Sequence, residues 1–388
     1  MAEDQKEEVD QKIAVAHKRF LYKTQDLSAK EKAQLQQDIL DAVFRDDAAP
    51  LYQQICSDLG WPVDTSKLEA MQKANAAALA EADERIKDAE ENLGESEVRE
   101  ALLAKADYLC KIGDRTAAQE AYKVTEGKTA GVGLKMDLVF SLLRLDMASG
   151  DWHAVKRNIL RAKLLCSEGG DWERKNRLKV YESLYLLATR DFKHAAELFL
   201  DSIATFTTTE LFSYETSIFY TVVTALITLD RVALKSKVVD APEILTVIDT
   251  IPNLGQFLNG FYDCKYHEFF EAFAAITEQI RGDPYLHPHF RYYVREIRVM
   301  AYSQFLESYK SVTLESMARA FGVNMDFMDQ ELCNFIVDGR LTAKIDKVSG
   351  IIETNRPDAK NAQYQQTLKH GDVLLNRLQK LAKVIDLE

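Results

Sequence analysis

Apolar residues recur along most of this chain at every third and fourth position, which places them on one face of an α-helix. Alternating apolar and polar positions, the pattern of β-strands, are much rarer. Only seven prolines and sixteen glycines interrupt the 388 residues, so few points in the chain favour a break. The pattern predicts a mostly α-helical fold.

One long, exposed helix is predicted from Ser66 to Glu100. The segment is rich in Ala, Glu and Lys, and it carries a thin apolar stripe. The stripe consists of Leu68, Met71, Leu79, Ala82, Ile86 and Leu93. So narrow a stripe suits a helix that packs on one side only. We assign residues 1–97 to an N-terminal helical extension that contains this helix.

A weak internal repeat follows in residues 98–285. Its turn positions are Asp114, Asp151, Asp191, Asp230 and Lys265, at intervals of 35 to 40 residues. Each unit holds an apolar helix, a short turn, and a second helix with small or aromatic residues. This layout is typical of a tetratricopeptide-like solenoid, in which each helix pair buries its face by stacking on its neighbours. Ordinary antiparallel helix pairs could give the same period, and both interpretations predict a row of helices with extended surfaces.

Residues 286–357 predict a winged helix. A strongly apolar helix runs from Phe290 to Tyr309, and two shorter helices follow, with Thr313 and Asn324 as N-caps and Gly322 as the stop between them. Their predicted buried sides hold Leu314, Met317, Ala318 and Phe321 in the first, and Met325, Met328, Leu332 and Phe335 in the second. A short hairpin is predicted next, with Ile345 and Val348 flanking a turn ahead of Ile351 and Ile352.

The second of these helices is unsuited to reading nucleic acid. Between residues 324 and 338 it has no lysine or arginine but carries four acidic residues, Asp326, Asp329, Glu331 and Asp338. Phosphates would repel such a helix, and the whole chain, with 49 basic and 61 acidic residues, has a net charge of −12. Lys344, Lys347 and Arg356 in the wing keep an RNA-binding winged helix as an alternative.

The C-terminal segment, residues 358–388, predicts a helix with an apolar seam. The seam residues follow spacings of four and three: Tyr364, Leu368, Gly371, Leu375, Leu378, Ala382 and Ile385, widened by Leu374 and Leu381. Such a seam needs a covering surface. It either docks back on the chain's own winged helix or contacts helices of other chains.

No catalytic, cofactor or metal site is predicted. The Gly-Lys-Thr at residues 127–129 lacks the earlier glycine of a phosphate-binding loop, and the five cysteines lie at least 54 residues apart. His287 and His289 form a His-x-His pair, but Ile297 and Met300 stand where a zinc-dependent isopeptidase would have serine and aspartate. No secretory or membrane-spanning segment is indicated either, so we expect a protein of the cytoplasm and nucleus.

The layout resembles that of PCI-domain proteins, scaffold subunits of assemblies such as the proteasome lid and the COP9 signalosome. Longer blocks make the resemblance more specific: "AAPLYQQICSDLGW" at 48–61, "GDWHAVKRNILRAKLLCSEGGDWERKNRLKVYESLY" at 150–185 and "LHPHFRYYVREIRVMAYSQFLESYKSV" at 286–312. These blocks are similar to the non-ATPase regulatory subunit 6 family of the 26S proteasome lid. The resemblance covers nearly the whole chain, from about residue 20 to its end.

The resemblance implies a non-catalytic scaffold in ubiquitin-dependent protein degradation. In that family, winged helices of several subunits join through their small sheets, and C-terminal helices gather in a bundle. It implies a sheet interface at Ile345, Val348, Ile351 and Ile352, and a bundle face at Leu368, Leu375, Leu378 and Ile385. Implied partners are other PCI-domain and MPN-domain lid subunits and proteasome base subunits, in a hetero-oligomer without nucleic acid or membrane. A signalosome PCI subunit, an RNA-binding winged-helix protein and a metal-dependent isopeptidase remain alternatives.

Overall fold

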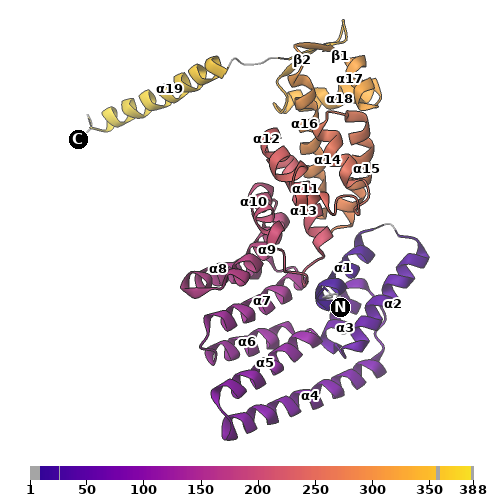
Figure 1. The fold of residues 1–388 in the computed structure, drawn as a ribbon, viewed down its shortest axis with the longest axis vertical. Coiled ribbons are helices and arrows are strands. Elements are labelled where there is room, and N and C mark those ends of the chain that lie inside the picture. The colour runs from indigo at the N-terminus through magenta and orange to yellow at the C-terminus, as the bar shows by residue number, and fades with distance from the viewer. Residues whose placement is uncertain (1–8, 26, 355–358, 386–388) are drawn as a thin grey trace. The chain divides into compact units, whose positions relative to one another are not determined.

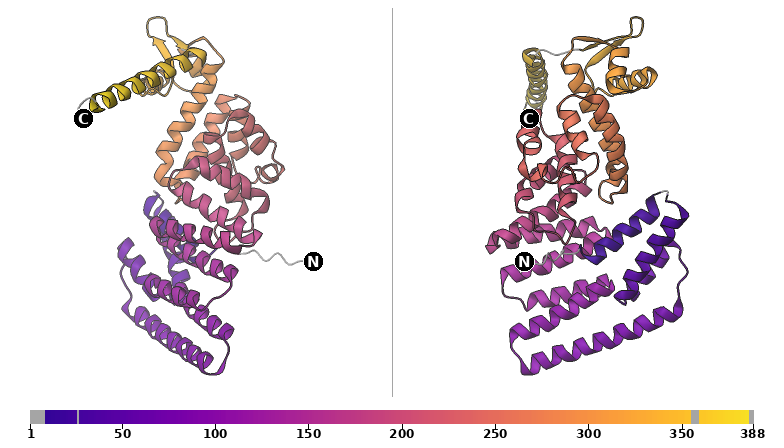
Figure 2. Two further views of the ribbon diagram at one scale, coloured as in Figure 1. Left: turned by 90° about the vertical axis from the view of Figure 1, so that its left-hand side faces the viewer. Right: turned by 45° about the vertical axis from the view of Figure 1, so that its right-hand side comes forward.

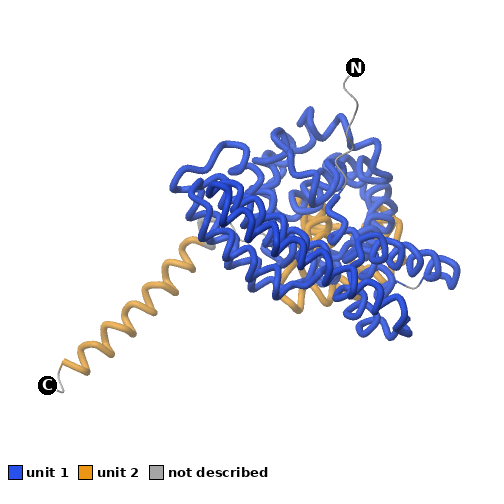
Figure 3. Tube along the Cα trace, turned by 90° about the horizontal axis from the view of Figure 1, so that it is seen from below, with its two compact units in different colours: residues 1–296 blue, residues 297–388 orange. Residues whose placement is uncertain are grey.

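The computed structural model describes residues 9–25, 27–354 and 359–385. These residues form helices joined by short turns and one small sheet, as the spacing of apolar residues predicted (Figure 1). The chain divides into two compact units, Met1–Glu296 and Ile297–Glu388, and the division falls within helix α16 (Figure 3). We describe each unit by itself.

Unit 1 begins with an N-terminal arm of four helices. They are α1 (Gln11–Thr24), α2 (Ala29–Arg45), α3 (Ala49–Leu59) and the long α4 (Thr65–Asn92). A capping box fixes the start of α2, since the Ser28 hydroxyl accepts a hydrogen bond from the Glu31 N–H and the Glu31 carboxylate accepts one from the Ser28 N–H. The arm has its own apolar core, which includes Ile39, Tyr52, Ile55 and Met71.

The predicted long helix is shorter than expected at its C-terminal end. Helix α4 stops at Asn92, because Leu93 is extended and Gly94 begins the next helix as its N-cap. The apolar stripe is correct in outline: Met71 is buried, whereas Leu93 is exposed because it lies beyond the end of the helix. The prediction of a continuous helix to residue 100 was therefore wrong.

Helix pairs make up the rest of unit 1 and stack in sequence order (Figures 1 and 2). The pairs are α5 (Glu95–Ile112) with α6 (Arg115–Gly127), α7 (Val132–Ser149) with α8 (Trp152–Gly169), α9 (Trp172–Ala188) with α10 (Phe192–Ser202), and α14 (Leu254–Tyr262) with α15 (Tyr266–Gly282). Between the last two pairs lie a 3₁₀ turn (Ile203–Thr205), α11 (Tyr214–Thr228), α12 (Arg231–Leu234), a π-helical turn (Lys235–Val239) and α13 (Pro242–Leu245).

The predicted turn positions stand at the starts of second helices. The carboxylates of Asp114, Asp151 and Asp191 each accept a hydrogen bond from the backbone N–H three residues on, which caps α6, α8 and α10. Asp230 and Lys265 also stand at N-caps, but without a side-chain hydrogen bond. The period therefore predicted the helix pairs, although the unit around Asp230 has only a four-residue second helix.

Gly113 shows how closely the arm and the stack approach each other. It ends α5 with a φ of 83°, in the left-handed region that favours glycine. A Cβ atom at this position would lie 2.7 Å from the Cβ atom of Leu51 in α3. The arm and the first helix pair therefore meet with no room for a side chain at the turn.

A partly buried charged cluster holds α7, α9 and the start of the chain together. Arg144 donates a hydrogen bond to Glu210 (Nη1 to Oε2, 2.7 Å), and Arg177 donates to both carboxylate oxygens of Glu210 at 2.8 and 2.7 Å. Tyr181 also donates its hydroxyl hydrogen to Glu210. The N–H of Asp10 donates to the Glu210 carbonyl oxygen at 2.8 Å, and the Asp10 carboxylate pairs with Arg144.

Opposing effects set the pKa of Glu210. Burial alone would raise it, but the positive charges of Arg144 and Arg177, with the hydrogen bonds from Arg177 and Tyr181, hold it below its usual range. The carboxylate is therefore charged at neutral pH and stabilises unit 1. This contribution is present above the unfolded-state pKa of about 4.3 and is lost as the pH falls through the lower folded-state pKa.

Unit 2 contains the winged helix. Its elements are the C-terminal part of α16 (Phe290–Glu307), β1 (Ser311–Thr313), α17 (Leu314–Phe321), α18 (Met325–Val337), β2 (Ala343–Asp346), β3 (Ile351–Thr354) and α19 (Ala359–Ile385). Thr313 caps α17 through its hydroxyl, and Gly322 ends it with a φ of 67°, as predicted. Asn324 stands at the N-cap of α18 but makes no side-chain capping bond.

The sheet has a third strand that the sequence did not predict. The strand order is β1-β3-β2, and both pairings are antiparallel. The pattern of Ser311 to Thr313 gave no signal because the strand is only three residues long and leads directly into α17. As a consequence, β3 is the central strand, and the outer strands are β1 and β2.

We predict that Glu210→Gln lowers the free energy of unfolding of unit 1 by about 2–3 kcal/mol at pH 7, because Arg144 and Arg177 lose their shared anion. Chemical denaturation of the full chain, followed by circular dichroism, measures this difference. The difference in unfolding free energy between variant and wild type should narrow as the pH falls from about 4.3, the unfolded-state pKa, through the lower pKa at which the folded carboxylate takes up its proton. A gap of constant size across this pH range would contradict the assigned role of the charge.

Candidate protein-interaction surfaces

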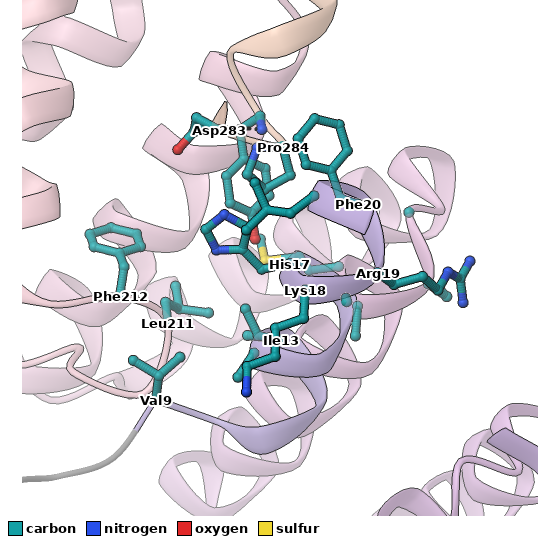
Figure 4. A pocket seen from close by; sticks show the side chains of 18 of the residues that line it. Val9, Ile13, His17, Lys18, Arg19, Phe20, Leu211, Phe212, Asp283 and Pro284 are labelled. Carbon is teal, nitrogen blue, oxygen red and sulfur yellow. Dashed lines mark hydrogen bonds between the residues drawn. The ribbon is translucent and has the colours of Figure 1, made fainter. Parts of the chain in front are cut away.

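A cavity in unit 1 has the size of a ligand site but not its chemistry. It has a volume of about 740 Å³ and is lined mainly by apolar residues of α1, the α7–α8 turn and the segments around Leu211 and Pro284 (Figure 4). Asp283 lies at its wall, where its carboxylate accepts hydrogen bonds from the Tyr220 hydroxyl at 2.5 Å and from the N–H groups of Tyr285 and Leu286. Burial raises the pKa of Asp283.

These contacts leave Asp283 in a structural role. It holds the turn that follows α15, and its hydrogen-bond partners come from the protein itself. His17, also at the cavity, has its Nε2 atom 3.3 Å from the carbonyl oxygen of Gly282. Across the part of the chain that the structure describes, this cavity shows no nucleophile paired with a base.

The His-x-His pair has ordinary structural partners. His287 and His289 lie in a 3₁₀ turn (His287–His289). The Nδ1 atom of His287 is 2.9 Å from the Arg281 carbonyl oxygen, and the Nε2 atom of His289 is 2.8 Å from the Ala188 carbonyl oxygen. Among the described residues, no cluster of three metal-ligating side chains occurs. The same residues include no helix long and apolar enough to cross a membrane.

Two of the four acidic residues between residues 324 and 338 are neutralised within unit 2. Glu331 accepts hydrogen bonds from Arg298 at 2.5 Å and from the Tyr302 hydroxyl at 3.1 Å. Asp329 pairs with Lys347 of the wing at 3.0 Å. Lys347, a wing cation of the kind that binds phosphate, is thus paired with a carboxylate of α18. This pairing weakens the case for nucleic acid further than the sequence alone did.

Helix α18 exposes more apolar surface than predicted. Met328, Leu332 and Phe335 are buried as expected, but Met325 is exposed. It is the first residue of the helix and lies one turn before Met328 enters the core. The expectation that Met325 is buried was therefore wrong.

The four residues proposed for the sheet interface have different environments. Ile345 is partly buried on the outer strand β2, and Ile351 is partly buried on the central strand β3. Ile352 is 0% exposed and belongs to the core, and its strand β3 has a neighbour on each side. Val348 is 99% exposed and lies inside the β2–β3 turn rather than beside it. Ile352 therefore lies in the predicted sheet with its side chain buried, and only β1 and β2 offer backbone edges for pairing.

The seam of α19 is exposed along the whole helix. Its proposed bundle residues Leu368, Leu375, Leu378 and Ile385 are each more than half exposed, as are the flanking Leu374 and Leu381. The alternating spacing of four and three residues therefore lies on one continuous helix, as predicted. A row of this length that is apolar and uncovered is unusual on a protein surface and indicates a binding site.

Comparison with known families divides the chain into three matched segments. The family described as "26S proteasome subunit RPN7" matches residues 64–237, and the PCI domain matches residues 269–356. A third family, described as "26S proteasome regulatory subunit RPN7/PSMD6 C-terminal helix", matches residues 363–385. The third match lies within α19 and includes all four of its proposed bundle residues.

Several curated relatives align with nearly the whole chain. The Arabidopsis thaliana protein "26S proteasome non-ATPase regulatory subunit 6 homolog" is 59% identical over 375 residues, which is 97% of each chain. The Oryza sativa protein "26S proteasome non-ATPase regulatory subunit 6" is 57% identical over 97% of this chain and 96% of its own. The Saccharomyces cerevisiae protein "26S proteasome regulatory subunit RPN7" is 36% identical over 96% of this chain and 93% of its own.

We predict that two substitutions in the wing differ greatly in their effect on stability. Ile352→Ala should destabilise unit 2 by about 2–4 kcal/mol, because it leaves a cavity beneath the central strand. Val348→Ala should change stability by less than about 0.5 kcal/mol, because its side chain is almost fully exposed. Thermal unfolding of the two variants, measured side by side, provides the comparison. Equal effects would contradict the assignment of Ile352 to the core.

Proposed function

The chain belongs to the family of the 26S proteasome regulatory subunit RPN7, and we propose that it acts as a non-catalytic scaffold of the proteasome lid. In this role it supports assembly of the regulatory particle and so serves ATP- and ubiquitin-dependent protein degradation. The observation that carries the proposal is the exposed seam of α19, which forms a continuous apolar face on a helix matched by a family of its own.

Burial of the seam provides the driving force for assembly. Each leucine transferred from water to an apolar contact contributes roughly 1.5–3 kcal/mol when it becomes fully buried. Leu368, Leu375 and Leu378 lie on one side of α19 and would be covered together by partner helices. We infer that α19 joins a helical bundle with the C-terminal helices of other subunits.

The winged helix offers the second surface. Because β3 is central, a neighbouring sheet can pair only with the outer side of β1 or of β2. On β2, the exposed Lys344 and the partly buried Ile345 would lie at such a junction. We infer that this edge, with the exposed turn at Val348, meets the winged helix of a neighbouring PCI-domain subunit.

The absence of a catalytic role is also part of the proposal. The two polar groups at the cavity, His17 and Asp283, have partners within the protein, and the His-x-His pair donates to backbone carbonyl groups. Rows of stacked helices instead supply extended surface for protein partners. We therefore propose a structural subunit whose partners are other PCI-domain and MPN-domain lid subunits and base subunits, in a hetero-oligomer.

The competing functions have less support. The names of these relatives concern the 26S proteasome, which favours that assembly over the signalosome. The acidic residues of α18 and the engaged Lys347 disfavour an RNA-binding role. Since the proposed work is proteasome assembly, we propose that the protein acts in the cytoplasm and nucleus, without contact to nucleic acid or membrane.

We predict that a chain ending at Asp358 folds but fails to join the lid, because it lacks the seam. A full-length variant with Leu375→Asp and Leu378→Asp should fail in the same way, since each aspartate would place a charge in the bundle. Affinity purification of the tagged chain from cells, followed by quantification of the other lid subunits, measures incorporation.

The matched control carries Ala77→Asp and Ala80→Asp, which add the same charges at the same spacing to an exposed face of α4. It should join the lid as the wild type does. Circular dichroism establishes that all variants are folded. Normal incorporation of the truncated chain would refute the role of α19 in assembly.

A further inference from the structure

Helix α19 carries a second organised face, opposite to the seam. Lys369, Val373, Arg377, Lys380 and Val384 follow one another at spacings of four, four, three and four residues. At 3.6 residues per turn they lie within roughly a quarter of the helix circumference. All five are exposed, and we name this face the basic stripe.

The charge of α19 is opposite to that of the chain as a whole. Residues 359–385 hold five basic residues and one acidic residue, Asp372, whereas the whole chain has a net charge of −12. Blocks of one sign within a chain of the other sign are a mark of an interaction segment. The basic stripe is therefore distinct from the acidic surface of the remaining chain.

Solvated faces on other helices of this protein mix acidic with basic residues. Several of their exposed arginines pair with an acid on the same helix, as Arg85 does with Glu81 and Arg319 with Glu315. In the described residues, Lys369, Arg377 and Lys380 make no ion pair. Solubility alone would be served equally well by mixed charges, so a single sign calls for another explanation.

The two valines add to this argument. Val373 and Val384 are half or more exposed; Val373 stands between Lys369 and Arg377, and Val384 follows Lys380 at the end of the stripe. Apolar side chains gain nothing against a phosphate backbone, and two valines are too few to hold a helix in a bilayer. Cations interleaved with small apolar groups instead complement a protein surface that carries carboxylates around shallow apolar contacts.

We propose that the basic stripe of α19 docks on an acidic protein surface of another subunit, while the seam faces the helical bundle. The proposal rests on the proposed function, because the seam must be covered for the stripe to be the outward face. In the assembled particle, Lys369 and Lys380 would each lie in contact with an Asp or Glu carboxylate of that subunit, and Val373 would fill the space between them.

Zero-length cross-linking of the assembled particle tests the contact directly. A carbodiimide joins a lysine amine to a carboxylate only where the two groups touch. Mass spectrometry of particles that contain the full-length chain should find Lys369 or Lys380 linked to an acidic residue of a different subunit. Finding neither lysine linked, while exposed lysines of other subunits are linked across their interfaces, would overturn the proposal.

Charge reversal provides the second test. Lys369→Glu with Lys380→Glu should lower incorporation into the lid roughly tenfold at low salt, because two attractions become repulsions. Added salt should shrink this difference, since it screens exposed charges. The matched control, Lys73→Glu with Lys87→Glu on the exposed face of α4, should incorporate normally. Equal incorporation of both variants would overturn the proposal.

Three further outcomes separate this proposal from its alternatives. Loss of incorporation at every salt concentration in the Leu375→Asp, Leu378→Asp variant, with normal behaviour of the lysine variant, would leave the proposed function intact and refute the stripe alone. Normal incorporation of the seam variant would refute both. Salt-sensitive binding of the wild-type chain to phosphatidylserine vesicles, abolished by the lysine reversal while lid incorporation is unchanged, would assign the stripe to a membrane instead.

Discussion

The structure of unit 1 depends on one constraint: a helix pair cannot bury its apolar face alone. The pairs α5–α6, α7–α8 and α9–α10 stack one on the next, and the core residues Leu109, Tyr122 and Leu142 come from three successive helices. A row built in this way leaves an apolar face open at its first pair. Here the N-terminal arm closes that end, through α4 packed along α5 and through the contact of Leu51 with Gly113.

The same constraint explains the charged cluster around Glu210. Local stacking fixes each pair only to its neighbours, so segments distant in sequence need contacts of another kind. Glu210 joins Arg144 of α7 to Arg177 of α9, and its backbone carbonyl binds the chain at Asp10. A carboxylate shared by two guanidinium groups can be buried because its charge is fully compensated. The cluster thereby connects the start of the chain to the middle of the row.

Much of this architecture could be predicted from the sequence, for identifiable reasons. Repeat turns were found because aspartate, here Asp114, Asp151 and Asp191, is among the residues favoured at helix N-caps, a local effect. The end of α4 at Asn92 was missed because the helical pattern continues on both sides of Gly94. Strand β1 was missed because its three residues pair with β3 about forty positions away, and no local pattern reports such pairing.

The two candidate surfaces also differ in how far local sequence could predict them. The seam of α19 was predictable since its spacing depends on one helix only, whereas the place of each wing residue depends on the sheet order. Two isoleucines adjacent in sequence, Ile351 and Ile352, point to opposite faces of β3, and only the strand order shows that neither lies on a free edge. Sequence reasoning therefore located the hairpin of the wing but not which of its residues are buried.

The exposed seam makes the stability of helix α19 depend on the surface that covers it. An isolated amphipathic helix gains little from packing, and most helical stability in proteins comes from burial of the apolar face. The free energy released when partners cover Leu368, Leu375 and Leu378 must therefore stabilise the helix as well as the association. In the proposed bundle, partner helices that cover the seam would therefore stabilise α19 as they bind it.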